Sequence, residues 1–172
     1  VGSEMCIRDR SYEIVQKSAE GDLPVYGVNT GFGKLANKII PSEDREQLQK
    51  NLVLSHCAGI GEPLPEDVTR LMMVLKIVSL SLGASGVKWS TIKQIERIIN
   101  SGIVPEIPHQ GSVGASGDLA PLAHMAAVMI GEGFAFYNGE KLSGFEALKR
   151  AGIEPITPVS YTHLTLPTMR TV

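Results

Sequence analysis

The sequence predicts a mainly α-helical fold with one small β-hairpin. Apolar residues recur at helical spacing over several stretches, acidic or hydroxyl residues precede these stretches, and glycines follow them. Asn138-Gly139, between two short apolar runs, is the strongest hairpin signal in the chain. The 172 residues, of which 43% are hydrophobic and 20% charged, are enough for one domain with a real core.

The first expected elements are a helix tail, a loop and a second helix. Residues 11–19 read as the tail of a helix, and residues 24–41, rich in glycine, as an ordered loop. Ser42 is a candidate N-cap for a helix that continues to Ala58, because acidic residues follow it in the first turn. Gly59 and Gly61 are expected to end that helix.

Two longer helices should follow. The first begins at Pro65, runs through residues 71–82, and is apolar on most faces, so we expect it to be deeply buried. Ser90 is expected to cap the second, which Gly102 ends. The apolar stripe of this second helix consists of Ile92, Ile95, Ile98 and Ile99.

The last third of the chain should hold a glycine-rich loop, a helix, the hairpin and a short final helix. The loop covers residues 111–117, and the helix runs from Leu119 to about Ile130. The hairpin turns at Asn138-Gly139, and Ser143 is expected to cap the final helix.

Charge and hydropathy exclude several classes of function. The chain has 16 basic and 18 acidic residues, so it has no basic excess with which to bind nucleic acid or an anionic membrane. The longest apolar stretch, residues 71–82, contains Lys76 and is too short to span a bilayer. Cys6 and Cys57 form no disulfide framework, so we expect a cytoplasmic protein.

Both ends of the sequence read as non-native. One short DNA element could encode residues 5–10 on one strand and residues 159–163 on the other, which is typical of a sequencing adapter. We therefore expect residues 1–10 and 160–172 to be adapter-like segments and residues 11–159 to be native. The natural protein is then expected to continue beyond both ends, with Cys57 as its only thiol in this region.

Three glycine-rich stretches are candidate loops for binding or chemistry. Residues 27–35 resemble a phosphate-binding loop only loosely, because Val28 replaces its first glycine and Leu35 replaces its Ser or Thr. The other two contain Ala-Ser-Gly, at residues 84–86 and 115–117. The first triplet follows a long helix and is expected to be a helix stop.

The second triplet has a chemical possibility that no ordinary side chain supplies. If the amide nitrogen of Gly117 attacks the carbonyl carbon of Ala115, a five-membered ring closes. Loss of water, including the Ser116 hydroxyl, then leaves an exocyclic methylene, which is a strong electrophile. Glycine permits the close approach that this requires, and the carboxyl group of Asp118 follows directly.

Three motifs in the chain together resemble the histidine and phenylalanine ammonia-lyase family. Residues 111–124, Gly-Ser-Val-Gly-Ala-Ser-Gly-Asp-Leu-Ala-Pro-Leu-Ala-His, are similar to its signature, in which Ala-Ser-Gly cyclises to 4-methylidene-imidazol-5-one. Residues 25–34 resemble its N-terminal active-site loop, and residues 51–64 resemble its substrate-selecting helix. The resemblance covers nearly all of residues 11–159 and implies the N-terminal part of the helical ammonia-lyase fold, which is fumarase/aspartase-like.

The resemblance implies a role for each matching residue. Ala115, Ser116 and Gly117 would form the electrophile, and no metal or nucleotide is implied. Asp118 would act in ring formation, although capping of its helix explains it equally well. Tyr26 matches a loop tyrosine that acts as an acid or base in the elimination; without the motif, it would be read as an aromatic residue packed on the core.

Ser55 and His56 stand at the substrate-selecting positions. Ser-His there resembles the members that convert L-histidine to urocanate and ammonia in histidine catabolism. An imidazole can exchange a hydrogen bond with a substrate imidazole, and a site with a dedicated polar partner rejects substrates that lack one. Without the motif, His56 would be read as a satisfied polar group. A related phenylalanine or tyrosine ammonia-lyase, or an aminomutase, is the alternative.

The remaining reactive side chains are expected to be structural. His109 and His124 fit no common metal-ligand spacing, so we expect His124 to be a structural helix residue and His109 a loop residue. Cys57 is expected to be a buried, small apolar group.

Family members are much longer than this chain, and they form homotetramers whose active sites combine several subunits. The resemblance therefore implies that the isolated 172-residue chain is inactive. It also implies that apolar helix faces, such as residues 71–82, are exposed here where partners normally cover them. A catalytically inert fragment that keeps the fold is a further alternative.

Overall fold

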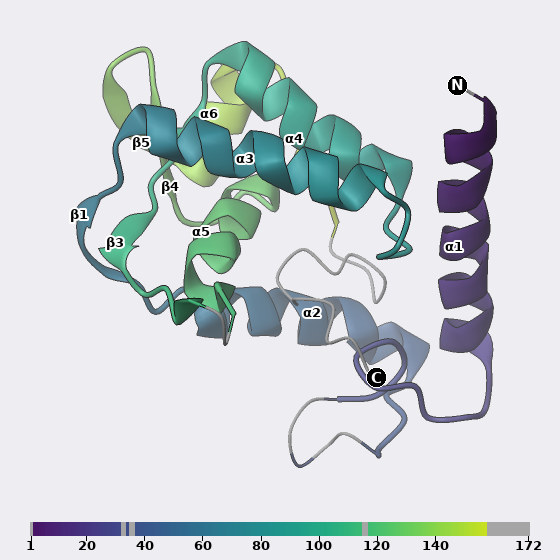
Figure 1. Ribbon diagram of the computed structural model, residues 1–172. Helices are drawn as coiled ribbons and strands as arrows, with labels where there is room; N and C mark the ends of the chain where they lie inside the picture. The colour runs from purple at the N-terminus through teal and green to yellow at the C-terminus, as the bar shows by residue number, and fades with distance from the viewer. Residues whose placement is uncertain (1, 32–33, 35–36, 115–116, 158–172) are drawn as a thin grey trace.

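The computed structural model describes residues 2–31, 34, 37–114 and 117–157 (Figure 1). It is mainly helical, as predicted, with two small antiparallel sheets. Ala115, Ser116 and the segment 160–172 lie outside the described residues. In the part of the chain that the structure covers, no helix is both long enough and apolar enough to cross a membrane.

Helix α1 (Gly2–Glu20) stands at one side of the molecule, and a loop leads from it to α2 (Ser42–His56) (Figure 1). The middle of α1 packs closely on Gly86: a Cβ added to Gly86 would lie 2.4 Å from Cγ2 of Val15. Its end is held by Arg45 of α2, whose Nη1 donates to the carbonyl oxygen of Ala19 over 2.7 Å.

Helix α2 differs from the prediction at both ends. Pro41, and not Ser42, occupies the N-cap position, because the backbone is already helical at Ser42. The helix ends at His56 and not at Ala58, because strand β1 (Ile60–Pro63) begins shortly afterwards. β1 pairs antiparallel with β3 (Pro108–Gln110), and this two-stranded sheet was not predicted.

Helices α3 (Glu66–Ser81) and α4 (Trp89–Ser101) lie side by side (Figure 1). α3 begins after Pro65, as predicted, and it buries Thr69, Met73 and Leu80. We predicted that this helix is deeply buried, and this is wrong for the face of α3 that points away from the core. No other described element covers that face. The exposed residues there include Leu71, Val74, Leu75, Val78 and Leu82.

Helix α4 confirms the predicted apolar stripe, with Ile92, Ile95 and Ile98 buried in the core. The prediction of Ser90 as its cap is wrong: Lys88 occupies the N-cap position, with an extended backbone and no side-chain cap. Gly102 ends the helix with φ of 87°, a left-handed conformation that favours glycine.

Helix α5 (Leu119–Met129) packs against α2. It leads to the hairpin of β4 (Phe134–Tyr137) and β5 (Glu140–Ser143), which turns at Asn138-Gly139 as predicted. β2 (Val104–Pro105) pairs with the other edge of β4. α6 (Gly144–Arg150) follows, and Oγ of Ser143 caps it by accepting from the amide nitrogen of Glu146 over 3.2 Å.

One hydrophobic core lies among α3, α4, α5 and α6 and includes the second half of α5, from Met125 to Met129. α5 contributes small and flexible residues that let its neighbours approach closely. The largest buried side chains are Met73, Leu80, Ile92, Ile95, Ile98, Ile103, Ile107, Met125, Met129 and Leu148.

Candidate active site

The second Ala-Ser-Gly triplet lies between β3 and α5, and the structure describes its flanks. Gly114 has φ of 58° and Gly117 has φ of 124°, which are conformations that favour glycine. The amide nitrogen of Gly117 donates to the carbonyl oxygen of Gly114 over 3.0 Å, so the two flanks lie together.

These flanks fit a ring formed from residues 115–117. Ring closure requires the nitrogen of residue 117 to approach a carbonyl carbon two residues earlier, and a side chain at 117 would hinder this approach. Because only glycine adopts φ of 124° without strain, Gly117 suits this step.

Asp118 stands at the N-cap position of α5, but its side chain does not cap the helix. Its Oδ1 instead accepts a hydrogen bond from the Ser112 hydroxyl. Ser112 Oγ in turn accepts from the amide nitrogen of Gly114 over 3.2 Å. Asp118 therefore occupies the N-cap position, as the helix-capping alternative expected, but its side chain makes no capping hydrogen bond.

Ser55 and His56 lie at the C-terminal end of α2, with both side chains folded back on their own helix. Ser55 Oγ and His56 Nδ1 contact the carbonyl oxygen of Leu52 at 2.9 and 2.7 Å. Because a carbonyl oxygen only accepts, Nδ1 of His56 must carry the hydrogen. Nε2 of a neutral His56 is then an acceptor, and it has no hydrogen-bond partner among the residues described.

Gly59 and His124 join the end of α2 to the start of α5. The amide nitrogen of Gly59 donates to His124 Nε2 over 3.2 Å. A Cβ added to Gly111 would lie 3.1 Å from the Cα of Gly59, so the chain after α2 packs directly on the segment before the triplet. The end of the helix that carries Ser55 and His56 therefore lies beside the segment that precedes the triplet.

The bond from Gly59 requires a neutral imidazole on His124. Burial lowers the pKa of His124, and the negative charge of Glu106 opposes this with a smaller effect. Both the bond and the pKa agree with the expectation that His124 is a structural residue.

Cys57 and His109 also make structural contacts. Cys57 is half-buried, its thiol donates to the carbonyl oxygen of Val53, and burial raises its pKa to about 11. His109 lies in strand β3 rather than in a loop, and its Nδ1 contacts the carbonyl oxygen of Glu62 at 2.9 Å. Among the residues placed, no three His, Cys, Asp or Glu side chains are grouped to bind a metal ion.

Tyr26 lies in the loop between α1 and α2, and its side chain is 56% exposed. Asn29, which the sequence analysis missed, organises this loop from a buried position. Its Oδ1 accepts from the amide nitrogen of Val25 over 2.7 Å, and its Nδ2 lies within 3.1 Å of three carbonyl oxygens. Those oxygens belong to Ser18, Gly21 and Leu23. An asparagine between glycines in a loop is a signal that could have indicated such a role.

The loop between α1 and α2 and the segment that precedes the triplet lie at opposite ends of α2 (Figure 1). Arg45, in the first turn of α2, bonds to both segments that border the loop, at Ala19 and Ile40. Gly111 instead packs beyond the last turn, on Gly59. Since 15 helical residues span about 22 Å, the contacts of the described residues hold these two segments at opposite ends of that length.

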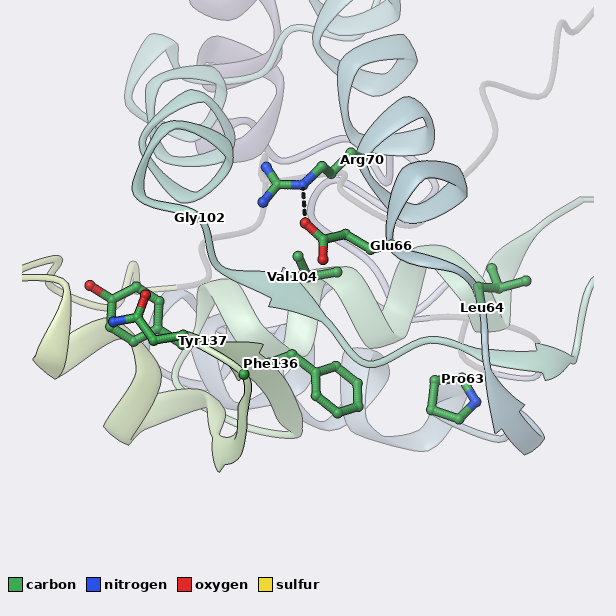
Figure 2. A pocket seen from close by; sticks show the side chains of 10 residues that line it. Pro63, Leu64, Glu66, Arg70, Gly102, Val104, Phe136 and Tyr137 are labelled. Atoms are coloured by element: carbon green, nitrogen blue, oxygen red, sulfur yellow. Dashed lines mark hydrogen bonds and ion pairs between the residues drawn. The ribbon is translucent and has the colours of Figure 1, made fainter.

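Two cavities lined by described residues contain neither Gly117 nor Asp118. Figure 2 shows one of about 670 Å³, with the ion pair of Glu66 and Arg70 on one wall and Phe136 and Tyr137 on another. It contains none of the predicted site residues. A second cavity, of about 380 Å³, is lined in part by Cys57 and His124.

The sequence model of the aromatic amino acid lyase family matches residues 7–167. Among solved structures, the phenylalanine aminomutase of Pantoea agglomerans is similar at 35% identity with a TM-score of 0.86. The histidine ammonia-lyase of Trypanosoma cruzi is similar at 33% identity with a TM-score of 0.85. The ergothioneine-degrading enzyme of Treponema denticola is similar at 26% identity with a TM-score of 0.88.

The match covers 96% of this chain in all three comparisons, but only 32%, 32% and 33% of the respective solved chains. The chain therefore spans about a third of the length of the structures that it matches.

Proposed function

The chain belongs to the aromatic amino acid lyase family, and from this premise we propose that it is part of an enzyme that eliminates ammonia from L-histidine to give urocanate. The observation that carries the proposal is the packing of Gly59 on Gly111. This packing brings the end of the helix that carries Ser55 and His56 next to the segment before the triplet, and it supports a site in which one substrate meets both.

His56 supports histidine as the substrate. With its Nδ1 hydrogen given to the Leu52 carbonyl, a neutral His56 offers an acceptor at Nε2. The imidazole N–H of L-histidine can donate to this atom, whereas the phenyl ring of phenylalanine has no donor. Leaving such a group unpaired in the bound complex penalises the wrong substrate.

The residues of the triplet, Ala115, Ser116 and Gly117, are proposed to form the methylidene-imidazolone, which supplies an electrophile that no side chain provides. Asp118 is proposed to assist the formation of the ring. Tyr26 is proposed to move a proton during the elimination. Because its loop is fixed at the far end of α2, the Tyr26 that serves a given triplet would come from another copy of the chain.

We propose that the complete enzyme is a homotetramer and that this chain alone is inactive. The exposed apolar face of α3 supports this, because such a face is normally covered in an assembly. We also propose a cytoplasmic location, and that residues 1–10 and 160–172 are non-native.

A phenylalanine or tyrosine ammonia-lyase, or an aminomutase, is the second candidate function. The identities to a phenylalanine aminomutase and a histidine ammonia-lyase, 35% and 33%, differ too little to favour either. A tyrosine hydroxyl could also donate to His56. Ammonia release from histidine, phenylalanine and tyrosine, measured on a full-length protein that contains residues 11–159, separates these candidates.

Ring formation is tested by the intact mass of the chain. The wild type is expected to be lighter than its sequence mass by two waters, and Ser116→Ala is expected to keep the full mass. Ser85→Ala, in the first Ala-Ser-Gly triplet, is the matched control and should lose two waters like the wild type. A folded wild-type chain of full mass would instead favour a catalytically inert fragment.

A further inference from the structure

We infer that Ser112 is a positioning residue for formation of the ring, acting through the carboxylate of Asp118. The inference rests on the proposed function, because it requires that residues 115–117 condense. It concerns a residue to which the family resemblance gives no role, and it follows from the hydrogen bonds that close this loop.

Two hydrogen-bonded closures surround the triplet, one inside the other. The inner closure is the bond from the amide nitrogen of Gly117 to the carbonyl oxygen of Gly114, at 3.0 Å. The outer closure is the bond from the Ser112 hydroxyl to Oδ1 of Asp118. Ser112 Oγ also accepts from the amide nitrogen of Gly114 over 3.2 Å and so links the two closures.

The base of the loop is anchored on the protein body. Gly111 packs between Gly59 and Ala120, each 3.1 Å from the position of an added Cβ, so the residue before Ser112 has little freedom to move. Asp118 leads directly into α5, most of whose side chains are buried. The bridge between Ser112 and Asp118 therefore joins two fixed points across the flanks of the triplet.

Ring formation needs proton transfers but no oxidant. The nitrogen of Gly117 forms a bond to the carbonyl carbon of Ala115. The first water takes that carbonyl oxygen with the amide hydrogens of Gly117 and Ser116, and the second takes the Ser116 hydroxyl with its Cα hydrogen. A carboxylate beside Gly117 can accept a proton and return it to a departing hydroxyl.

Ser112 fixes which part of this carboxylate is available. Its hydroxyl occupies Oδ1 of Asp118, while Oδ2 has no hydrogen-bond partner among the residues that the structure places. Because the hydroxyl hydrogen goes to Asp118, Ser112 Oγ keeps a lone pair for the Gly114 amide. Ser112 thus holds the inner turn and the carboxylate in one arrangement.

The rate of ring formation tests the role of Ser112. The chain is made by cell-free synthesis, and the loss of two waters is followed by intact mass at timed intervals. We expect Ser112→Ala to slow this loss by about tenfold or more, because a mispositioned proton-transfer group loses most of its effect. Ser112→Thr keeps the hydroxyl and should restore a rate near that of the wild type.

Two further variants separate positioning from simple loop closure. Asp118→Asn keeps an oxygen that accepts from Ser112 but removes the carboxylate, and it should be at least as slow as Ser112→Ala. The double variant should be no slower than Asp118→Asn, because Ser112 acts through Asp118. Ser90→Ala, an exposed serine of α4, is the matched control and should mature at the wild-type rate.

The outcomes distinguish this inference from the proposed function. A wild-type chain that never loses water counts against the ring itself and removes the basis of the inference. A wild type that matures while Ser112→Ala matures equally fast overturns the role of Ser112 alone. Fast maturation of Asp118→Asn beside slow Ser112→Ala would also overturn it, since the bridge would then only close the loop.

Discussion

Single polar side chains, the buried Asn29 and the half-buried His124, hold segments next to the candidate site. Asn29 gathers three carbonyl oxygens and one amide around itself and so shapes the loop of Tyr26. His124 plays a similar part for the end of α2 by accepting from the Gly59 amide. Both residues act on backbone groups that would otherwise be left unpaired on burial.

The bond between Gly59 and His124 makes the stability of the chain depend on pH. Burial places the pKa of folded His124 below the ordinary value near 6.5 of the unfolded chain. Between these two values the unfolded chain binds more protons, so this contribution to stability is complete above about pH 6.5 and decreases as the pH falls. Chemical unfolding at pH 5 to 8 should show this decrease.

His124→Gln should lack this part of the pH dependence, because glutamine does not titrate. His109→Gln is the matched control: His109 is exposed, and this variant should keep the decrease seen in the wild type. Equal pH profiles for the wild type and His124→Gln would contradict the prediction.

Elements set by local signals were predicted better than elements set by distant contacts. The turn at Asn138-Gly139 and the cap at Ser143 depend on neighbouring residues and were predicted correctly. The ladder of β1 and β3 pairs Ile60 with Gln110, and its strands contain glycine and proline, so no local pattern could indicate it. Boundaries at Ser42 and Ser90 failed because the backbone becomes helical without a serine cap there.

The candidate site shows the same division. The motifs pointed to Ser55, His56 and the triplet as candidates, because each motif is a run of consecutive residues. The hydrogen bonds of Ser112 and the place of the loop between α1 and α2 could not be read in this way, because each depends on how the folded segments pack. Motifs therefore indicate which residues are candidates, and the packing of α2 on α5 brings the segments that carry them together.

The junction between β5 and α6 depends on the absence of a side chain at Gly144. A Cβ added there would lie 2.1 Å from the carbonyl oxygen of Glu132, which is backbone and cannot move aside cheaply. Gly144→Ala is expected to lower the free energy of unfolding by about 2 kcal/mol or more, as overpacking does in tight sites. Chemical denaturation measures this change.

Gly21→Ala is the matched control for Gly144→Ala. A Cβ at Gly21 would lie 3.5 and 3.6 Å from its nearest neighbours, which is ordinary contact, so this variant should be nearly neutral. A Gly144→Ala variant as stable as the control would show that the junction can relax.

In the whole molecule, helix α3 has one face packed on the core and one face that no described element covers. Met73 and Leu80 face the core, while Leu71, Leu75 and Val78 are 55 to 58% exposed. Lys76 is half-buried between these faces, and burial lowers its pKa. Among the residues placed, Lys76 has no ion-pair partner, so this helix carries both an uncovered apolar stripe and a poorly compensated charge.

The uncovered stripe should make the isolated chain self-associate. Leu71, Leu75, Val78 and Leu82 recur every three or four residues, so they line one side of α3 and can pack against the same stripe of another copy. We expect sedimentation velocity to show association that increases with concentration. The double variant Leu75→Glu/Val78→Glu should weaken it by roughly tenfold or more, because each buried aliphatic side chain contributes about 1.5 kcal/mol or more.

The helical circular dichroism of this double variant should equal that of the wild type, because both positions are exposed. Leu80→Glu, on the buried face of the same helix, is the matched control and should unfold the chain, since it places an unpaired charge in the core. A wild-type chain that stays monomeric at every concentration would show that the stripe does not drive association. In that case the exposed face of α3 would no longer support a homotetramer, although the ring-forming chemistry of the triplet would be unaffected.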